Sequence, residues 1–414
     1  MDGVTRREVL RRAGLAGLGV AAGAALPRGA WAAGEKSFLT TGLPDGVYGI
    51  ADLEALPGKK PLIRLSYRPP NYETPVDYFK TVFTPNDAFF VRYHLANIPE
   101  QIDAKTWRLK IGGEAASTPV EFSLDDLKKF EQVEIAAVCQ CSGNRRGLSD
   151  PHVPGVQWGL GAMGNALWKG VRFRDLLAKA GLKKEALEIV LDGADGPVLE
   201  KTPDFVKSLP VWKALDENTI VAWEMNGQPL PHFNGFPARL IVPGWTATYW
   251  TKHFTSANAV SKPFEGFWMK AAYRIPTGKF PVIDRFISQE TPANTPITEM
   301  VVNSVITSPA GGTTVSVGKP VEIAGIAWDG GYGIAGVEAS ADGGKTWLAA
   351  SLGKDYGRFS FRPWTFSFTP QQKGDATVMV KATNRMGQTQ TESLIFNPAG
   401  YHNNVMRPLH LSVA

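Results

Sequence analysis

Two patterns of apolar and polar positions divide the chain. From residue 84 to about residue 260, short alternating stretches that indicate β-strands are separated by turns and by two helical segments. One helix begins after its N-cap Ser123, and the other runs from Phe173 to Ala180 and is closed by Gly181. Many short strands with few helices predict an α+β body of mixed strands rather than repeated βαβ units.

The second pattern lies beyond a segment rich in Pro, Thr and Asn at residues 288–296. Seven short alternating stretches follow it, at residues 313–317, 321–328, 336–341, 347–350, 358–368, 377–383 and 389–396. Gly-rich turns separate these stretches, and their spacing is typical of an immunoglobulin-like β-sandwich. We therefore expect a body at residues 33–298 and a sandwich at residues 299–414.

The first 32 residues are predicted not to belong to the folded body. They hold the pair Arg6-Arg7, an apolar run at residues 13–26 and the small-x-small sequence Ala30-Trp31-Ala32. This arrangement predicts a twin-arginine export signal, and hence a periplasmic protein. The apolar run is shorter than the roughly 20 residues that a membrane span requires, so no span is expected in the mature form.

Composition and charge narrow the classes of function. With 414 residues and 43% hydrophobic residues, the chain is long enough for two or three domains with sizeable cores. Removing residues 1–32 lowers the formal net charge from +5 to +2, so most of the apparent basicity belongs to the export signal. Nucleic-acid binding, which would need a concentrated basic face, is not expected.

A turn that leads into a strand is predicted at residues 84–95, and the strand brings chemically useful side chains together. Its period of two places Phe90, Arg92 and His94 on one face and Tyr93 on the other. Two side chains that can carry positive charge therefore share a surface with an aromatic ring. A loop dense in Gly and Trp is predicted at residues 155–159 and 165–171. It includes Trp158 and is typical of a ligand wall or of a packed irregular core.

The chain has two cysteines, Cys139 and Cys141, followed closely by Arg145 and Arg146. On a strand, two residues separated by one point the same way but lack the geometry of an ordinary disulfide. A thiolate beside positive charge could be a nucleophile with His94 or His152 as base, a redox thiol or a metal ligand. Two buried strand residues beside a surface arginine pair would also fit. No C-x-x-C-H sequence is present, so no covalently attached haem of that type is expected.

Four segments together resemble the sulfite oxidase family of molybdenum enzymes, most closely its bacterial periplasmic sulfite dehydrogenases. In order along the chain, they are FFVRYH at residues 89–94, CSGNRR at 141–146, GFPAR at 235–239 with VPG at 242–244, and FWMKAAYR at 267–274. The likeness spans nearly all of the chain beyond the signal. It implies that residues 33–298 form a molybdopterin-binding catalytic domain and residues 299–414 a dimerisation domain.

The resemblance implies a molybdenum bound by a pyranopterin dithiolene and one protein thiolate, with no haem in this chain. Cys141 falls at the family's ligand position, whereas Cys139 does not and is interpreted as a buried strand residue. A soft thiolate suits a molybdenum already bound by sulfur. A planar guanidinium suits an anionic substrate.

The resemblance also implies the residues of the site. For the substrate pocket they are Arg92, His94, Arg146, Trp158 and Tyr273. For the cofactor they are Phe90, Arg92, Tyr93, His94, Cys141, Asp195, Asn234, Arg239 and Lys252. The family has a histidine where this chain has Asn234, while His232 lies two residues earlier, so which of the two contacts the cofactor stays open. No pocket arginine is expected from residues 299–414, and Arg145 has no predicted role.

The function implied is oxidation of sulfite to sulfate, with electrons passing to an external acceptor, and a c-type cytochrome is the expected acceptor. A homodimer through residues 299–414, or a complex with a cytochrome subunit, is expected. A reductase of sulfoxide or nitrate with the same cofactor is an alternative, ranked lower because two arginines suit a small oxyanion better than a neutral sulfoxide. A non-catalytic periplasmic binding protein is a further alternative.

Overall fold

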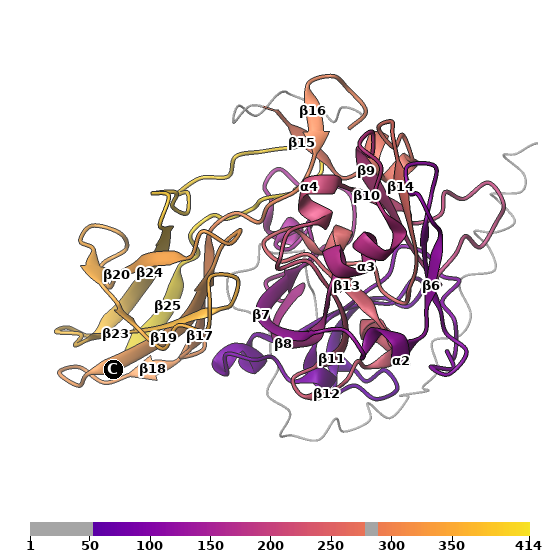
Figure 1. The fold of residues 1–414 in the computed structure, drawn as a ribbon. Coiled ribbons are helices and arrows are strands. Elements are labelled where there is room, and N and C mark those ends of the chain that lie inside the picture. Colours follow the sequence, from indigo (N-terminus) through magenta and orange to yellow (C-terminus); the bar gives the residue numbers. More distant parts are fainter. Residues whose placement is uncertain (1–52, 278–288) are drawn as a thin grey trace, which may run out of the picture. The chain divides into compact units, whose positions relative to one another are not determined.

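The computed structural model describes residues 53–277 and 289–414, and the predicted export signal lies outside these ranges. Within them the protein is mostly β-structure with few, short helices (Figure 1). This agrees with the predicted mixture of many strands and few helices. In the described ranges, no helix is long and apolar enough to cross a membrane.

Three sheets make up most of the body. The first has the order β1-β2-β3-β4, with β1 (Leu53–Glu54), β2 (Leu62–Ser66), β3 (Asn71–Glu73) and β4 (Val91–Arg92). The second has the order β10-β9-β14-β5-β6, with β5 (Leu109–Gly112), β6 (Val120–Phe122), β9 (Glu188–Gly193), β10 (Lys207–Pro210) and β14 (Phe254–Val260). The third has the order β12-β11-β8-β7, with β7 (Gln132–Gln140), β8 (Met163–Arg172), β11 (Ile220–Met225), β12 (Gln228–Pro229) and β13 (Arg239–Ile241), which pairs with β11. Their strands pair antiparallel except β14 with β5.

The α-helices of the described residues are α2 (Leu124–Leu127), α3 (Phe173–Ala180), α4 (Val211–Ala214) and α5 (Phe267–Lys270). Single 3-10 turns lie at η1 (Val76–Lys80), η2 (Asn86–Ala88), η3 (Arg146–Leu148), η4 (His232–Asn234) and η5 (Ala247–Tyr249). Ser123 caps α2 as predicted, because its side chain accepts from the backbone of Asp126 while the Asp126 carboxylate accepts from the backbone of Ser123. Gly181 ends α3 at a φ of 64°, a conformation that glycine adopts without a Cβ penalty.

Two sheets follow the antiparallel pair β15 (Arg274–Pro276) and β16 (Asn294–Pro296). One has the order β17-β19-β23-β22, with β17 (Asn303–Ser308), β19 (Val321–Trp328), β22 (Ser351–Leu352) and β23 (Arg362–Phe368). The other has the order β18-β25-β24-β20-β21, with β18 (Thr314–Val315), β20 (Ile334–Ser340), β21 (Leu348–Ala349), β24 (Gly374–Asn384) and β25 (Leu409–Val413). Inward residues of both sheets share one apolar core.

The prediction of a strand at residues 389–396 is wrong, because only isolated bridges occur there, at Thr389 and Thr391. The side chain of Gln390 explains the difference: its Oε1 accepts from the backbone N–H of Ala382 at 3.0 Å, taking a donor that a neighbouring strand would have used. The pattern also missed β17 and β25. In β25 the alternating residues Leu409, Leu411 and Val413 are buried.

The end of β7 is held from two directions. Its partner β8 sets Cys139 opposite Gly164, and a Cβ at Gly164 would lie 2.5 Å from the ring of Phe89, so glycine lets that ring pack against the strand. On the other side, Val138 donates its backbone N–H to the carbonyl of Phe359 at 2.9 Å. The segment that carries both cysteines is therefore fixed by contacts from both halves of the sequence.

Candidate active site

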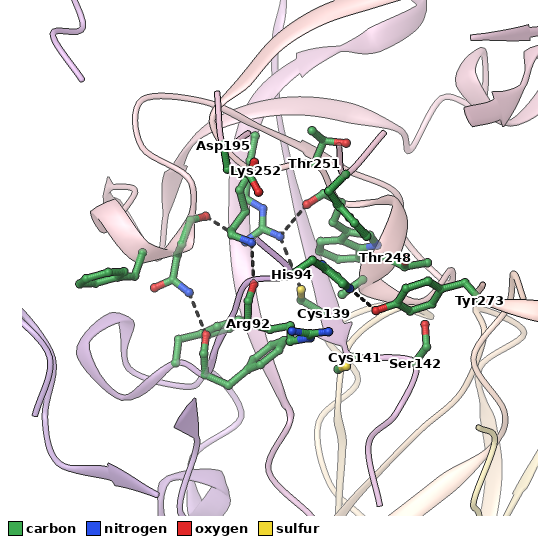
Figure 2. A pocket seen from close by; sticks show the side chains of 18 residues that line it. Arg92, His94, Cys139, Cys141, Ser142, Asp195, Thr248, Thr251, Lys252 and Tyr273 are labelled. Carbon is green, nitrogen blue, oxygen red and sulfur yellow. Dashed lines mark hydrogen bonds between the residues drawn. The ribbon is translucent and has the colours of Figure 1, made fainter. Parts of the chain in front are cut away.

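A cavity with about 640 Å³ of empty space, part of it open to solvent, is lined by residues from widely separated parts of the chain (Figure 2). Nine of the lining residues are ones that the sequence analysis assigns to the site: Phe90, Arg92, His94, Cys141, Asp195, Asn234, Arg239, Lys252 and Tyr273. Nine others are added by the structure: Phe89, Cys139, Ser142, Phe205, Phe233, Ala247, Thr248, Trp250 and Thr251.

Cys141 enters the cavity just beyond the end of β7. Its backbone N–H donates to the carbonyl of Ala162 at 2.9 Å, and its carbonyl accepts from Asn144 at 3.0 Å. The Asn144 side chain accepts from the backbone of Ala162 at 3.0 Å, which closes the turn. Cys141 is a buried free thiol. The hydrogen bonds of this loop therefore hold the thiol in a fixed position at the cavity.

Cys139 is also a buried free thiol and lines the same cavity. Its Sγ lies 3.8 Å from a guanidinium nitrogen of Arg239. Burial nevertheless raises the pKa of the Cys139 thiol to about 11, so it is protonated at neutral pH. Its environment therefore does not favour a thiolate.

Three cationic side chains face the cavity. Lys252 donates to the backbone carbonyl of Arg92 at 2.7 Å, and its ammonium lies 3.7 Å from the ring centroid of Tyr93. Burial lowers the pKa of Lys252 to about 8, and the nearby carboxylate of Asp195 partly opposes that shift. Arg92 donates to the side-chain oxygen of Asn71 at 3.0 Å and Arg239 to the carbonyl of Asn234 at 2.9 Å. These contacts hold positive charge around an open volume.

His94 and Tyr273 form a bonded pair at the cavity, since His94 Nε2 and the Tyr273 hydroxyl are hydrogen-bonded (Figure 2). The imidazole stacks on Phe205, with ring centroids 3.6 Å apart and planes 7° from parallel. Burial holds the pKa of His94 well below its usual range, and the charges of Arg92 and other cations add to this effect. The ring is therefore a neutral hydrogen-bonding group at neutral pH.

Two family models match the chain. Residues 94–268 match the oxidoreductase molybdopterin binding domain, and residues 294–412 match the Mo-co oxidoreductase dimerisation domain. Mitochondrial sulfite oxidase of Rattus norvegicus is 32% identical over 373 residues, which cover 86% of this chain and 67% of that protein. The chain belongs to the sulfite oxidase family of molybdenum oxidoreductases.

Two further similarities, one to a curated protein and one to a solved structure, extend over most of the chain. Sulfite oxidase of Arabidopsis thaliana is 27% identical over 372 residues, covering 84% of this chain and 93% of that protein. Among solved structures, the sulfane dehydrogenase SoxCD from Paracoccus pantotrophus matches with a TM-score of 0.71 and 25% identity, covering 87% of this chain and 88% of that chain. The cofactor of the family is molybdenum bound to molybdopterin.

The cavity fits such a cofactor on its own chemistry. The Nε atoms of Arg92 and Arg239 and the hydroxyl of Thr248 are buried there without a hydrogen-bond partner among the described residues. Buried polar groups are normally satisfied, so orphaned donors beside Lys252 point to an anionic group that would complete them. Cys141 is the lining thiol on the tightly bonded loop and suits a soft metal.

Three residues assigned to the site from the sequence do not line the cavity. Trp158 is fully buried and meets the edge of Phe90, with ring centroids 6.5 Å apart. Tyr93 is bonded through its hydroxyl to His253 Nε2 at 2.7 Å. Arg146 donates from Nε to the carbonyl of Ala399 at 2.8 Å, and its charge is close enough to help lower the pKa of His94.

The structure separates His232 from Asn234. Asn234 lines the cavity and donates to the carbonyl of Phe90 at 3.1 Å, while its side-chain oxygen accepts from the ammonium of Lys59. His232 instead faces His253, with ring centroids 5.1 Å apart, and does not line the cavity. Asn234 is therefore the residue of the two that can reach a group in the cavity.

Several polar residues of the site carry no signal in the sequence. Lys59 and Thr248 lie in segments without a motif, and Lys207 is buried in β10, where it donates to the carbonyl of Trp268 at 2.6 Å. The Lys207 ammonium lies 5.3 Å from the ring centroid of Tyr273. Ser142, which donates to the hydroxyl of Thr246 at 2.9 Å, lies inside the cysteine motif and could have been named.

Arg145, which had no predicted role, is a structural link. Its side chain is buried and donates to the carbonyls of Ser304 at 2.6 Å and Val405 at 3.0 Å. Its own carbonyl accepts from Asn403 at 3.1 Å. The two adjacent arginines thus differ: Arg145 binds the cysteine loop to residues of the C-terminal part, whereas Arg146 reaches toward the His94–Tyr273 pair.

Proposed function

We propose that this protein oxidises sulfite to sulfate, with water as the oxygen source and two electrons and two protons released. The observation that carries this proposal is the position of Arg92 in the cavity. Its buried, unpartnered Nε lines the same cavity as the Cys141 thiol, so a small oxyanion bound to it would lie near a metal held by that thiol. The sulfite oxidases that resemble the chain support the same reaction.

The cofactor, when bound, supplies the two-electron oxidation and the transfer of oxygen. The residues of this chain bind and orient the reactants. Cys141 would supply the single protein ligand, and Arg239, Lys252 and Thr248 would hold the anionic end of the cofactor. Arg92 would hold the substrate anion, with Arg146 adding positive charge from behind the His94–Tyr273 pair.

The His94–Tyr273 pair would orient the substrate anion. In the tautomer that carries its proton on Nε2, the neutral His94 donates to the Tyr273 oxygen, which leaves the hydroxyl proton free to point at an oxygen of the anion. Because burial keeps the imidazole neutral, this arrangement does not depend on pH near neutrality. The pair is therefore a fixed donor rather than a titrating base.

The two electrons must leave through an external acceptor, for which we propose a c-type cytochrome, in a periplasmic enzyme exported by residues 1–32. We also propose the domain limits 33–298 and 299–414 and an immunoglobulin-like form for the second domain. Dimerisation through that domain, or a stable complex with a cytochrome subunit, would follow. The description of the family model that matches residues 294–412 supports the dimer.

The test compares two activities of the purified, molybdenum-loaded protein. Sulfite-dependent reduction of cytochrome c is expected, with negligible viologen-dependent reduction of nitrate or of a sulfoxide. The reverse pattern would favour the reductase alternative. A preparation that contains molybdenum yet shows neither activity would refute the proposal, and one without molybdenum or pterin would favour a binding protein.

A variant sharpens this test. Arg92→Gln should raise the KM for sulfite about tenfold to a hundredfold, because a hydrogen bond to a charged group contributes about 1.5–3 kcal/mol. Arg108→Gln is the matched control, since Arg108 does not line the cavity and donates to two backbone carbonyls. Equal KM values for the two variants would remove Arg92 from substrate binding.

A further inference from the structure

A tyrosine from the C-terminal part of the chain packs against the site. Tyr401 is 4% exposed and stacks on Tyr273, with ring centroids 5.7 Å apart and planes 12° from parallel. The guanidinium of Arg146 lies 5.2 Å from the centroid of the Tyr401 ring. One aromatic ring therefore contacts both the tyrosine that lines the cavity and the arginine behind it.

The backbone around Tyr401 is fixed as firmly as its ring. The side chain of Asn397 donates to the Tyr401 carbonyl at 2.6 Å and accepts from its N–H at 3.0 Å. Arg146 donates from Nε to the carbonyl of Ala399 at 2.8 Å. Gly400 has a φ of 62°, and a Cβ there would lie 2.8 Å from Cγ of Arg146. The segment is thus shaped around the Arg146 side chain.

The space around the Arg146 guanidinium is closed from other sides too. A Cβ at Gly143 would lie 2.6 Å from its Nη1, and a Cβ at Gly155 would lie 2.9 Å from the same atom. Arg146 also donates to the carbonyl of Val156 at 3.2 Å. With backbone on these sides, the Tyr401 ring is a side-chain surface that helps to set where the guanidinium lies.

We propose that Tyr401 is a positioning residue for the substrate anion, acting through Tyr273 and Arg146; this inference rests on the proposed function. The ring, rather than the hydroxyl, carries the effect, because the Tyr401 hydroxyl makes no hydrogen bond within the described part of the chain. Without the ring, the stacked Tyr273 and the guanidinium lose a common support. Small displacements of groups that orient a reactant weaken productive binding strongly.

The test compares Tyr401→Leu with Tyr401→Phe in the molybdenum-loaded protein. Tyr401→Leu should raise the KM for sulfite about tenfold with a smaller change in kcat, and should raise the Kd of sulfate, measured by calorimetry, by a similar factor. Tyr401→Phe keeps the ring and should restore both values to within about twofold of wild type. Phe366→Leu is the matched control, because it removes a buried ring from the C-terminal core, and Phe366 does not line the cavity.

The outcomes separate the two proposals. If wild-type protein binds sulfate but does not oxidise sulfite, the proposed function fails, and the sulfate Kd of the variants still decides the role of Tyr401. If Tyr401→Leu leaves the KM and the sulfate Kd unchanged, the positioning role is refuted. It is also refuted if Tyr401→Leu and Phe366→Leu lower thermal stability and molybdenum content alike with no change in KM, since the effect would then be structural only.

Discussion

Lys59 gives the protein a testable dependence of stability on pH. The residue is 8% exposed, and its ammonium donates to the backbone carbonyls of Asn86 at 2.7 Å and Phe89 at 3.1 Å, and to the side chain of Asn234. Burial lowers its pKa from 10.5 to about 7; the charge of Asp87 opposes the shift, whereas a nearby guanidinium adds to it. The folded chain therefore holds this proton less tightly than the unfolded chain does.

The sign and size of the effect follow from linkage. Between pH 7 and 10.5 the unfolded chain binds more protons at Lys59, so the free energy of unfolding rises with pH across that window. Below pH 7 both states are protonated and the contribution is constant. At about 1.36 kcal/mol for each pKa unit, the gain between pH 7 and pH 9 is about 2 kcal/mol.

Urea denaturation at pH 7 and pH 9 measures this gain. In Lys59→Met the extra stability at pH 9 should disappear, while effects of other groups cancel in the comparison with wild type. Lys60→Met is the control, because Lys60 is exposed and pairs with Asp87 at the surface, and it should keep the wild-type difference. The reasoning is refuted if Lys59→Met shows the same pH difference as wild type.

Three further outcomes are expected. Gly143→Ala should raise the KM for sulfite about tenfold to a hundredfold, since its Cβ would lie 2.6 Å from Nη1 of Arg146; an unchanged KM from steady-state kinetics would contradict the placement. Cys141→Ser should lose sulfite turnover and bind molybdenum less tightly, whereas Cys139→Ser should keep both; metal analysis and activity assays that show the reverse would exchange their roles. Trp328→Phe should lower the free energy of unfolding, measured in urea, by about 1–3 kcal/mol. The indole of Trp328 donates at 2.6 Å to the side-chain oxygen of Gln140 at the end of β7, and the substitution would leave that oxygen unpaired. A loss below about 0.5 kcal/mol would count against that bond.

Local pattern was sufficient for the parts of the fold that depend on neighbouring residues. Ser123 caps its helix because the bonded partner, Asp126, lies three residues away. The alternation around Arg92 correctly grouped Phe90, Arg92 and His94, which all line the cavity. Local pattern failed at Gln390, where a side chain replaces a ladder bond and ends the pairing that apolar alternation suggested.

The contacts of the long polar side chains depend on partners that are distant in the sequence. Arg145 and Arg146 are adjacent and chemically identical, yet Arg145 bonds to Ser304, 159 positions away, while Arg146 bonds to Ala399. Lys59 reaches Asn234 across 175 positions. No periodicity links such positions, so these contacts could not be predicted from the pattern of the chain.

The sequence by itself therefore determined the mixture of strands and few helices, the family motifs around Cys141 and half of the residues that line the cavity. Periodicity suffices for the strands, because it records which face of a local element is buried, whereas the cavity residues were implied by the resemblance to the family. Only the tertiary structure decided that Asn234 rather than His232 faces the cavity, and that Tyr401 packs against Tyr273, which lines the cavity. Burial of a charged or aromatic side chain depends on which remote carbonyls and rings surround it, and chain folding alone brings those groups together.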